Sequence, residues 1–265
     1  MEFLLDLPFV VSFVLVCVVC VAVANLGLWL VRKKFAPESL KENHEVAASI
    51  FNAYGMLYAV VVAFVVFVTW TRYDEASKNI ELEASEASDL FFVANVFPDT
   101  LKKQVRQALS DYMNSIYNDE WKAMLNGESS PKTVDAVRKL MHVYISMDVK
   151  SLDNVPAYQE SFKRLNDLAQ YRRLRNYSAA DSVPNVIWVV LLLGAIIEVI
   201  YTYFFGVKKA VVQYCMTSAL TVTLTLILVL IFTLDHPFKG TNAVSSAPIK
   251  NVSEMMGRIV QNQNK

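Results

Sequence analysis

The sequence has few glycines, few cysteines and no excess of charge of either sign. Its seven glycines form no phosphate-binding loop, and its 25 basic residues equal its 25 acidic residues in number. A balanced charge gives no electrostatic reason to expect nucleic acid as a partner. The three cysteines, Cys17, Cys20 and Cys215, all fall within apolar stretches. They therefore indicate packing or lipid-facing residues rather than a redox motif.

Patterns typical of catalysis or metal binding are also absent from the sequence. His44, His142 and His236 are scattered, without a second histidine or a cysteine at the spacing of a zinc site. No Gly-x-Ser-x-Gly elbow of a hydrolase occurs. Adjacent acidic residues such as Asp74 and Glu75 lie on different faces of a helix, which indicates solvated surfaces. The sequence therefore predicts no enzyme, no cofactor and no metal.

Apolar residues are abundant and concentrated in long stretches. They make up 54% of the chain, above the ~45–50% of ordinary soluble domains. Four stretches are long enough to cross a bilayer as helices, over residues 9–31, 46–70, 185–206 and 210–234. We therefore predict an all-α integral membrane protein with a first transmembrane hairpin in residues 1–70, a helical extramembrane domain over 71–184, a second hairpin over 185–234 and a C-terminal tail over 235–265.

The predicted extramembrane domain shows helical periodicity throughout. Its clearest apolar stripe, which Pro98 ends, consists of Ile80, Ala84, Ala87, Leu90, Phe91, Ala94 and Phe97. Further stripes predict helices near residues 101–125, 134–147 and 156–177, and Ile145 is expected on the buried face of the second of these.

The residues at the ends of the predicted spans indicate in which membrane the protein lies and which loops face the cytoplasm. Glu2 and Asp6, without a basic residue nearby, are unlike a cleaved signal peptide, so the first span is expected to be retained. The short basic loops, with Arg32 to Lys34 and Lys41 in one and Lys208 and Lys209 in the other, are expected in the cytoplasm. We therefore expect a multi-pass protein of a bacterial inner (plasma) membrane.

The stretch over residues 46–70 has one unusual face. Asn52, Met56, Ala59 and Ala63 recur at spacings of four, three and four, so they share that face. Val60, Phe64 and Phe67 follow on a similar side, and a ring of them in an oligomer would form a hydrophobic constriction. Packing against another helix or against lipid explains the same residues, and Gly55, Ala59 and Ala63 form a small-residue ridge typical of a packing seam. Both interpretations stay open.

Glu198 is the one charged residue within the third span. A carboxyl group in a bilayer is costly to bury as an ion, so it is usually protonated, paired or next to a polar cavity. A polar stripe on the fourth span offers candidate partners, because its members repeat every four residues: Gln213, Thr217, Thr221 and Thr225. An ion-pathway role and a neutral structural role, with each threonine bonded to its own helix, are both consistent with this pattern.

Arginines gather just before the third span. Arg172, Arg173 and Arg175 would concentrate anions at a pore mouth, or bind lipid headgroups at the membrane surface.

Several stretches in order resemble the bestrophin-like domain family. They are FNAYGMLYAVVVAFVVFVTWTRYDEA with the following ELEASEASDL, Tyr112, the pair Glu120 and Trp121, RRLR before VPNVIWVVLLLGA, and LDHPFKG, in which Asp235, Pro237, Phe238 and Gly240 fit the closing D-x-P-F-x-G pattern. From the residues alone, the closing motif indicates a helix exit and a turn.

The resemblance implies four spans around a central helical domain. Bestrophins themselves are oligomeric anion channels whose second helix lines a narrow hydrophobic neck. This sequence shows no copy of a bestrophin calcium clasp, and its short basic loops predict the opposite orientation. Channel activity is therefore implied by analogy of fold.

Two hypotheses of function follow. The first is a homo-oligomeric channel for inorganic ions, anions being expected, with the second span lining the pore within the lipid bilayer. The alternative is a non-conducting membrane scaffold or sensor whose helical domain binds a protein partner.

Overall fold

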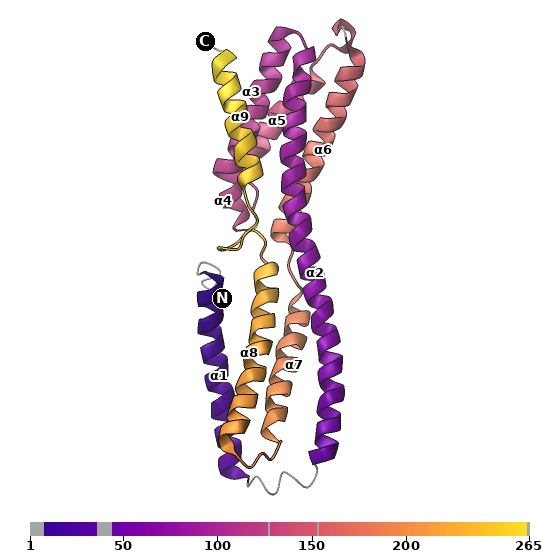
Figure 1. Cartoon of the computed structure of the whole chain (residues 1–265). Coiled ribbons are helices and arrows are strands. Elements are labelled where there is room, and N and C mark those ends of the chain that lie inside the picture. Colours follow the sequence, from indigo (N-terminus) through magenta and orange to yellow (C-terminus); the bar gives the residue numbers. More distant parts are fainter. Residues whose placement is uncertain (1–7, 36–43, 127, 153, 264–265) are drawn as a thin grey trace. The chain divides into compact units, whose positions relative to one another are not determined.

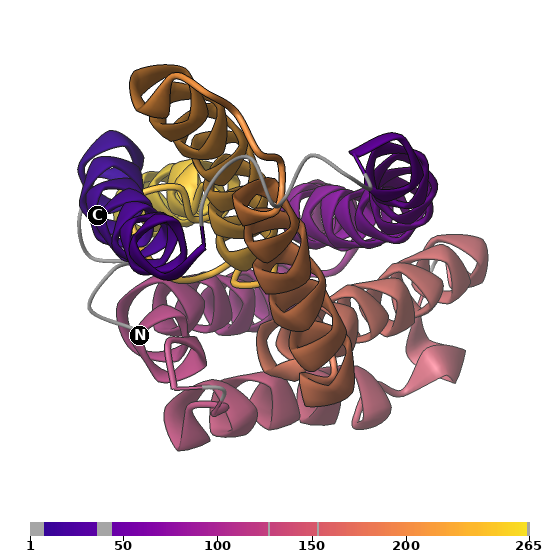
Figure 2. The same ribbon diagram turned by 90° about the horizontal axis from the view of Figure 1, so that it is seen from below.

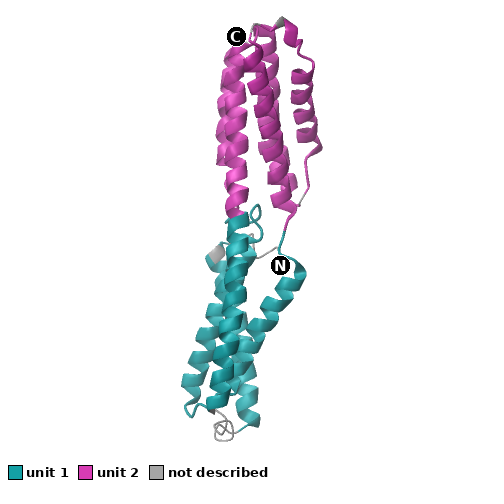
Figure 3. Cartoon of the chain, turned by 90° about the vertical axis from the view of Figure 1, so that its right-hand side faces the viewer, with its two compact units in different colours: residues 1–72, 182–242 teal, residues 73–181, 243–265 magenta. Residues whose placement is uncertain are grey.

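A computed structural model describes residues 8–35, 44–126, 128–152 and 154–263 (Figure 1). The expectations for Glu2, Asp6 and Lys41 lie outside these residues. The described residues form helices and contain no strand. They divide into two compact units, residues 1–72 with 182–242 (unit 1) and residues 73–181 with 243–265 (unit 2), which Figure 3 colours separately. The predicted all-α class is thus confirmed.

Unit 1 holds the apolar helices. They are α1 (Phe9–Lys34), the first part of α2 (His44–Val93), α7 (Asn185–Tyr203) and α8 (Ala210–Leu234). All four helices are long and apolar enough to cross a membrane. In Figures 1 and 2, α8 runs beside both α1 and α7, and it packs against both helices. The third predicted span ends earlier than expected, at Tyr203, because the backbone turns at Phe204 and Phe205.

Helix α2 continues without a break from His44 to Val93, so it serves both units. The sequence analysis treats residues 46–70 and the stripe that begins at Ile80 as separate helices. They join because no glycine or proline occurs between Gly55 and Pro98, and the residues between the two stretches include good helix formers such as alanine, glutamate and lysine. The change in composition after Trp70 therefore changes the surroundings of the helix and not its backbone.

Unit 2 is a helical bundle. Besides the end of α2 it contains η2 (Ala94–Val96), α3 (Asp99–Ser115), the π-helical turn η3 (Ile116–Glu120), α4 (Trp121–Met124), α5 (Pro131–Ile145), η4 (Val149–Ser151), α6 (Val155–Ala180) and α9 (Ala247–Gln263). All seven residues of the stripe from Ile80 to Phe97 are buried, as predicted. Ile145, in contrast, is exposed, because α5 turns Thr133, Leu140 and Tyr144 inward instead.

The predicted C-terminal tail contains a helix that the sequence analysis missed. Helix α9 packs on α3 and buries Ile249 and Met256. These two residues are seven apart and so lie on one face of the helix. Residues 243–265 therefore belong to unit 2.

Candidate functional site

The membrane part of α2 has two contrasting sides. One side packs on α7 and α8 through Tyr58 and Val62, which join Leu191, Leu224 and Ile231 in a buried apolar cluster. The other side is covered by none of the other described helices. All six predicted pore or gate residues lie on this exposed side: Asn52, Ala59, Val60, Ala63, Phe64 and Phe67. Phe64 and Phe67 are 67% and 66% exposed, so their contacts are made outside this chain.

Two tyrosines of α2 form hydrogen bonds with α7. The Tyr58 hydroxyl donates to the Leu191 carbonyl at 2.8 Å, and the Tyr54 hydroxyl donates to the Gly194 carbonyl at 3.2 Å. Gly194 is needed where the Tyr58 ring crosses α7, because a Cβ at this position would lie 2.3 Å from a ring carbon. The sequence analysis did not identify these tyrosines, although their spacing of four places them on one helix face.

Glu198 lies on the side of α7 that faces α2. Its side chain is only 6% exposed, and a Cβ added to Gly55 would lie 3.3 Å from Glu198 Oε1. Among the described residues no hydrogen bond reaches its carboxyl group. Glu198 therefore occupies the α2–α7 contact instead of the expected contact with the polar stripe of α8.

The polar stripe of α8 is satisfied without Glu198. The Gln213 amide donates to the carbonyls of Thr202 and Phe205, both at 3.0 Å, and its oxygen accepts from Arg32. Thr217 shares a 2.9 Å hydrogen bond with Thr202, and Thr221 donates back to the Thr217 carbonyl at 2.8 Å. Thr225 is buried next to them. The stripe thus joins α8 to α1 and α7. Of the two interpretations left open by the sequence, the back-bond of Thr221 to its own helix fits the second, and no bond to Glu198 is seen among the described residues.

The arginines before the third span do not form one exposed group. Arg175 is completely buried in unit 2, where it binds Glu83 at 2.6 Å and Glu120 at 2.8 Å. Arg172 binds the other oxygen of Glu120 at 2.6 Å. Only Arg173 remains exposed. The expected role at a pore mouth or on lipid headgroups is therefore wrong for Arg172 and Arg175, whose charges are used inside the bundle.

The surroundings raise the pKa of two members of this network, Arg175 and Tyr112. Burial on its own lowers the pKa of Arg175, but the carboxylates of Glu83 and Glu120 outweigh it and raise the pKa. The Tyr112 hydroxyl donates to Glu83 at 2.5 Å, and burial, reinforced by the charge of Glu83, raises its pKa well above the ordinary value. The π-helical turn that ends at Glu120 carries this side chain to the interior. Trp121, the next motif residue, begins α4.

The closing motif connects two membrane helices. Asp235 follows α8 directly, is buried, and accepts a 2.7 Å hydrogen bond from the backbone N–H of Val183, just before α7. Pro237 and Phe238 are buried behind it. Gly240 has a φ of 80°, a conformation that glycine adopts without strain. The motif therefore closes the turn and ties the end of α8 to the start of α7.

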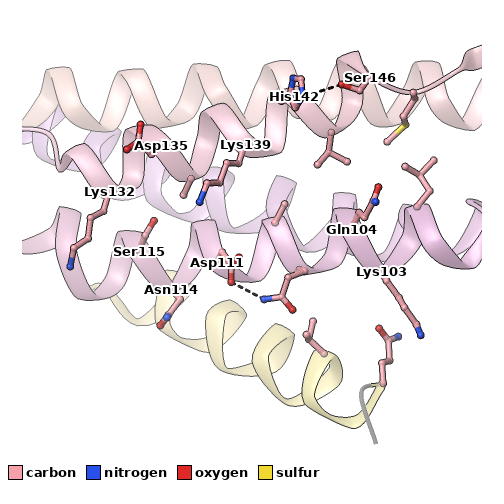
Figure 4. A pocket seen from close by; sticks show the side chains of 18 of the residues that line it. Lys103, Gln104, Asp111, Asn114, Ser115, Lys132, Asp135, Lys139, His142 and Ser146 are labelled. Atoms are coloured by element: carbon pink, nitrogen blue, oxygen red, sulfur yellow. Dashed lines mark hydrogen bonds between the residues drawn. The ribbon is translucent and has the colours of Figure 1, made fainter.

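Unit 2 also contains a groove of about 1060 Å³ between α3, α5 and α9 (Figure 4). Part of its polar lining is already paired, since Lys132 binds Asp119 at 2.7 Å and Gln107 donates to Asp111 at 2.8 Å. Across the described residues, no group of three or more metal-ligating side chains occurs.

The Bestrophin-like domain model matches residues 18–249 of the chain. The chain belongs to the Bestrophin-like family. The match covers both units of this bestrophin-like protein, including Asp235 and the buried arginine network. No curated protein matches the chain.

Solved structures with a similar fold include point variants of a bacterial bestrophin homologue from Klebsiella pneumoniae. One has a TM-score of 0.74 at 13% identity and covers 92% of this chain and 98% of its own. A second has a TM-score of 0.71 at 13% identity, covering 94% and 98%. A third has a TM-score of 0.67 at 14% identity, covering 97% and 99%. At this identity the likeness shows the fold alone: a membrane protein with four transmembrane helices and a helical domain.

Proposed function

We propose that this bestrophin-like chain assembles into a ring that conducts ions, anions in particular, across a bacterial inner membrane. The observation that carries the proposal is the exposed side of α2, which includes Asn52, Ala63 and Phe67 and is covered by none of the described helices. Under this proposal the side faces the axis of the ring. Its partners are further copies of the chain, bilayer lipids and the conducted inorganic ion.

The packing inside unit 1 argues for a pathway between chains rather than through one. Side chains fill the space between α2, α7 and α8, where Tyr58, Val62, Leu191, Leu224 and Ile231 are all buried. Because side chains fill this interior, ions have no path between the helices of one chain. The exposed side of α2 is then the surface available to ions.

The residues on that side suggest how the pathway is controlled. Residues 46–70 contain no charged side chain, so no fixed charge on this stretch repels or traps the conducted ion. Val60, Phe64 and Phe67 are large and apolar, and a ring of such side chains gates by excluding water from a narrow pore. Asn52 is the polar residue at the same side and provides a hydrated end to the apolar stretch.

The proposal is tested by recording currents from purified protein in planar bilayers. Phe64→Ala is expected to raise the single-channel conductance, because a narrower part of the pore becomes wider and wetter. Leu193→Ala is a matched control, since Leu193 is also an exposed apolar membrane residue but lies on α7. Reversal potentials under a chloride gradient report the selectivity.

Two results would contradict the proposal. One is the lack of any current from correctly assembled protein. The other is a current that Phe64→Ala and Leu193→Ala leave equally unchanged. A protein that is folded and monomeric would favour the alternative, a scaffold or sensor whose unit 2 binds a protein partner.

A further inference from the structure

We infer that Glu198 is a proton-binding site within the membrane, located where α2 crosses α7. The site consists of the Glu198 carboxyl group, the glycine gap at Gly55 and the two tyrosines on either side of that gap. The inference concerns a site away from the exposed side of α2. Only its consequence for conduction rests on the proposed function.

The first step is that the neighbouring polar groups are already occupied. Tyr54 and Tyr58 are the titratable residues of α2 that face Glu198, and each donates its hydroxyl proton to a carbonyl of α7. From α8, Thr217 is bonded to Thr202, one turn beyond Glu198. Among the described residues no basic side chain pairs with the carboxyl group.

The second step is the electrostatic cost of an ion at this position. Glu198 is only 6% exposed, and it lies on a helix that is long and apolar enough to cross a membrane. An isolated carboxylate in such a medium is strongly disfavoured, whereas a neutral carboxylic acid is tolerated. The described packing is therefore that of the neutral acid.

The third step is the room left for the group. Gly55 is the α2 residue opposite the carboxyl, and a side chain there would press on Oε1. The contact between α2 and α7 elsewhere is made by large rings, Tyr54 and Tyr58. A carboxylate formed at this contact therefore needs water or a cation beside it.

Carbodiimide labelling tests the site on the full-length protein in lipid vesicles. A protonated carboxyl adds across one C=N bond of N,N′-dicyclohexylcarbodiimide: its oxygen bonds to the central carbon and its proton goes to a nitrogen. The acyl group then migrates to nitrogen, so the stable product is the acid plus the whole reagent. Peptide mass spectrometry measures the adduct at Glu198.

We expect Glu198 to be labelled at about pH 5 and less at about pH 9, because each pH unit above its pKa lowers the neutral fraction roughly tenfold. Glu83 and Glu120 are matched controls, since they are equally buried but paired with Arg175. They are expected to stay unlabelled. A water-soluble carbodiimide is expected to label the exposed Glu254 and to leave Glu198 unmodified.

Three outcomes would overturn the inference. They are an unlabelled Glu198 at every pH, labelling that does not change between about pH 5 and about pH 9, and equal labelling by the water-soluble reagent. Currents are recorded separately from wild-type protein and from Glu198→Gln, which mimics the neutral acid. Lack of current in both with normal labelling would refute the channel and leave the proton site intact.

Discussion

Both units of the molecule bury carboxyl groups, but they compensate them differently. In unit 2, Glu83 and Glu120 are completely buried and share Arg175, with Tyr112 and Arg172 as further donors. In unit 1, Glu198 is almost as deeply buried and has no basic partner among the described residues. Ion pairs fix one arrangement of helices, whereas a lone carboxyl can gain or lose a proton. Unit 2 thus pairs its buried carboxyl groups with cations, whereas the carboxyl group at the α2–α7 contact of unit 1 has no such partner among the described residues.

The largest expected effect comes from breaking the unit 2 network. Arg175→Met leaves two carboxylates buried without their shared cation, and removing one partner of a buried ion pair costs about 3–5 kcal/mol of stability. In a chemical unfolding experiment, the variant is expected to unfold at a much lower denaturant concentration than the wild-type protein. Arg173→Met is the matched control, because Arg173 is exposed. Equal stability of the two variants would show that the network is dispensable.

A steric change tests the α2–α7 contact next. Gly194→Ala places a Cβ 2.3 Å from the Tyr58 ring, and overpacking of this kind costs about 1–3 kcal/mol. Gly257→Ala is the control in α9, where a Cβ meets no atom within 4 Å; there alanine is expected to stabilise the helix. The difference in midpoint of thermal unfolding measures the effect, and a difference of zero would mean that α2 does not rest on Gly194.

Alkaline pH provides a second test of unit 2. Burial raises the pKa of Tyr112 above its ordinary value of 10.0, so its stabilisation is complete below pH 10 and is lost as the pH rises further. The free energy of unfolding is expected to fall by up to about 1.4 kcal/mol per pH unit from this residue. Tyr112→Phe should lack that part of the decline. The same slope in both proteins would contradict the assignment.

The smallest effect is expected at the closing motif. Asp235→Asn keeps the shape of the side chain but replaces the charged acceptor of the Val183 N–H by a neutral one. We expect a loss of about 1 kcal/mol, measured by unfolding. Lys239→Gln serves as a control for a nearby change of charge. A loss at Lys239→Gln as large as that at Asp235→Asn would show that the hydrogen bond is not the cause.

Features that depend on one helix at a time could be predicted from the sequence. The apolar stretches gave the four spans, and the buried stripe from Ile80 to Phe97 was predicted residue by residue, because burial follows helical periodicity. The shared face of Asn52, Ala59 and Ala63 on α2 was identified from spacing, but the sequence did not decide between a packing seam and a pore lining. The closing motif was interpreted as a helix exit, and the structure adds the bond from Asp235 to Val183.

Contacts between helices were not predictable in the same way. Arg175 and Glu83 are far apart in the sequence, and no local pattern shows that they meet. The position of Glu198 beside Gly55 of α2 was not predicted, because the candidate partners on α8 were chosen by adjacency in the chain. Helix α9 was missed because its apolar face is short and lies in a polar stretch.

The mass of the purified particle in nanodiscs, corrected for lipid, tests the central claim most directly. If the exposed side of α2 lines a shared pathway, the protein mass is a multiple of the 29.9 kDa chain that corresponds to a closed ring of several copies. A monomer or a dimer would leave the exposed side of α2 facing lipid and would contradict the account.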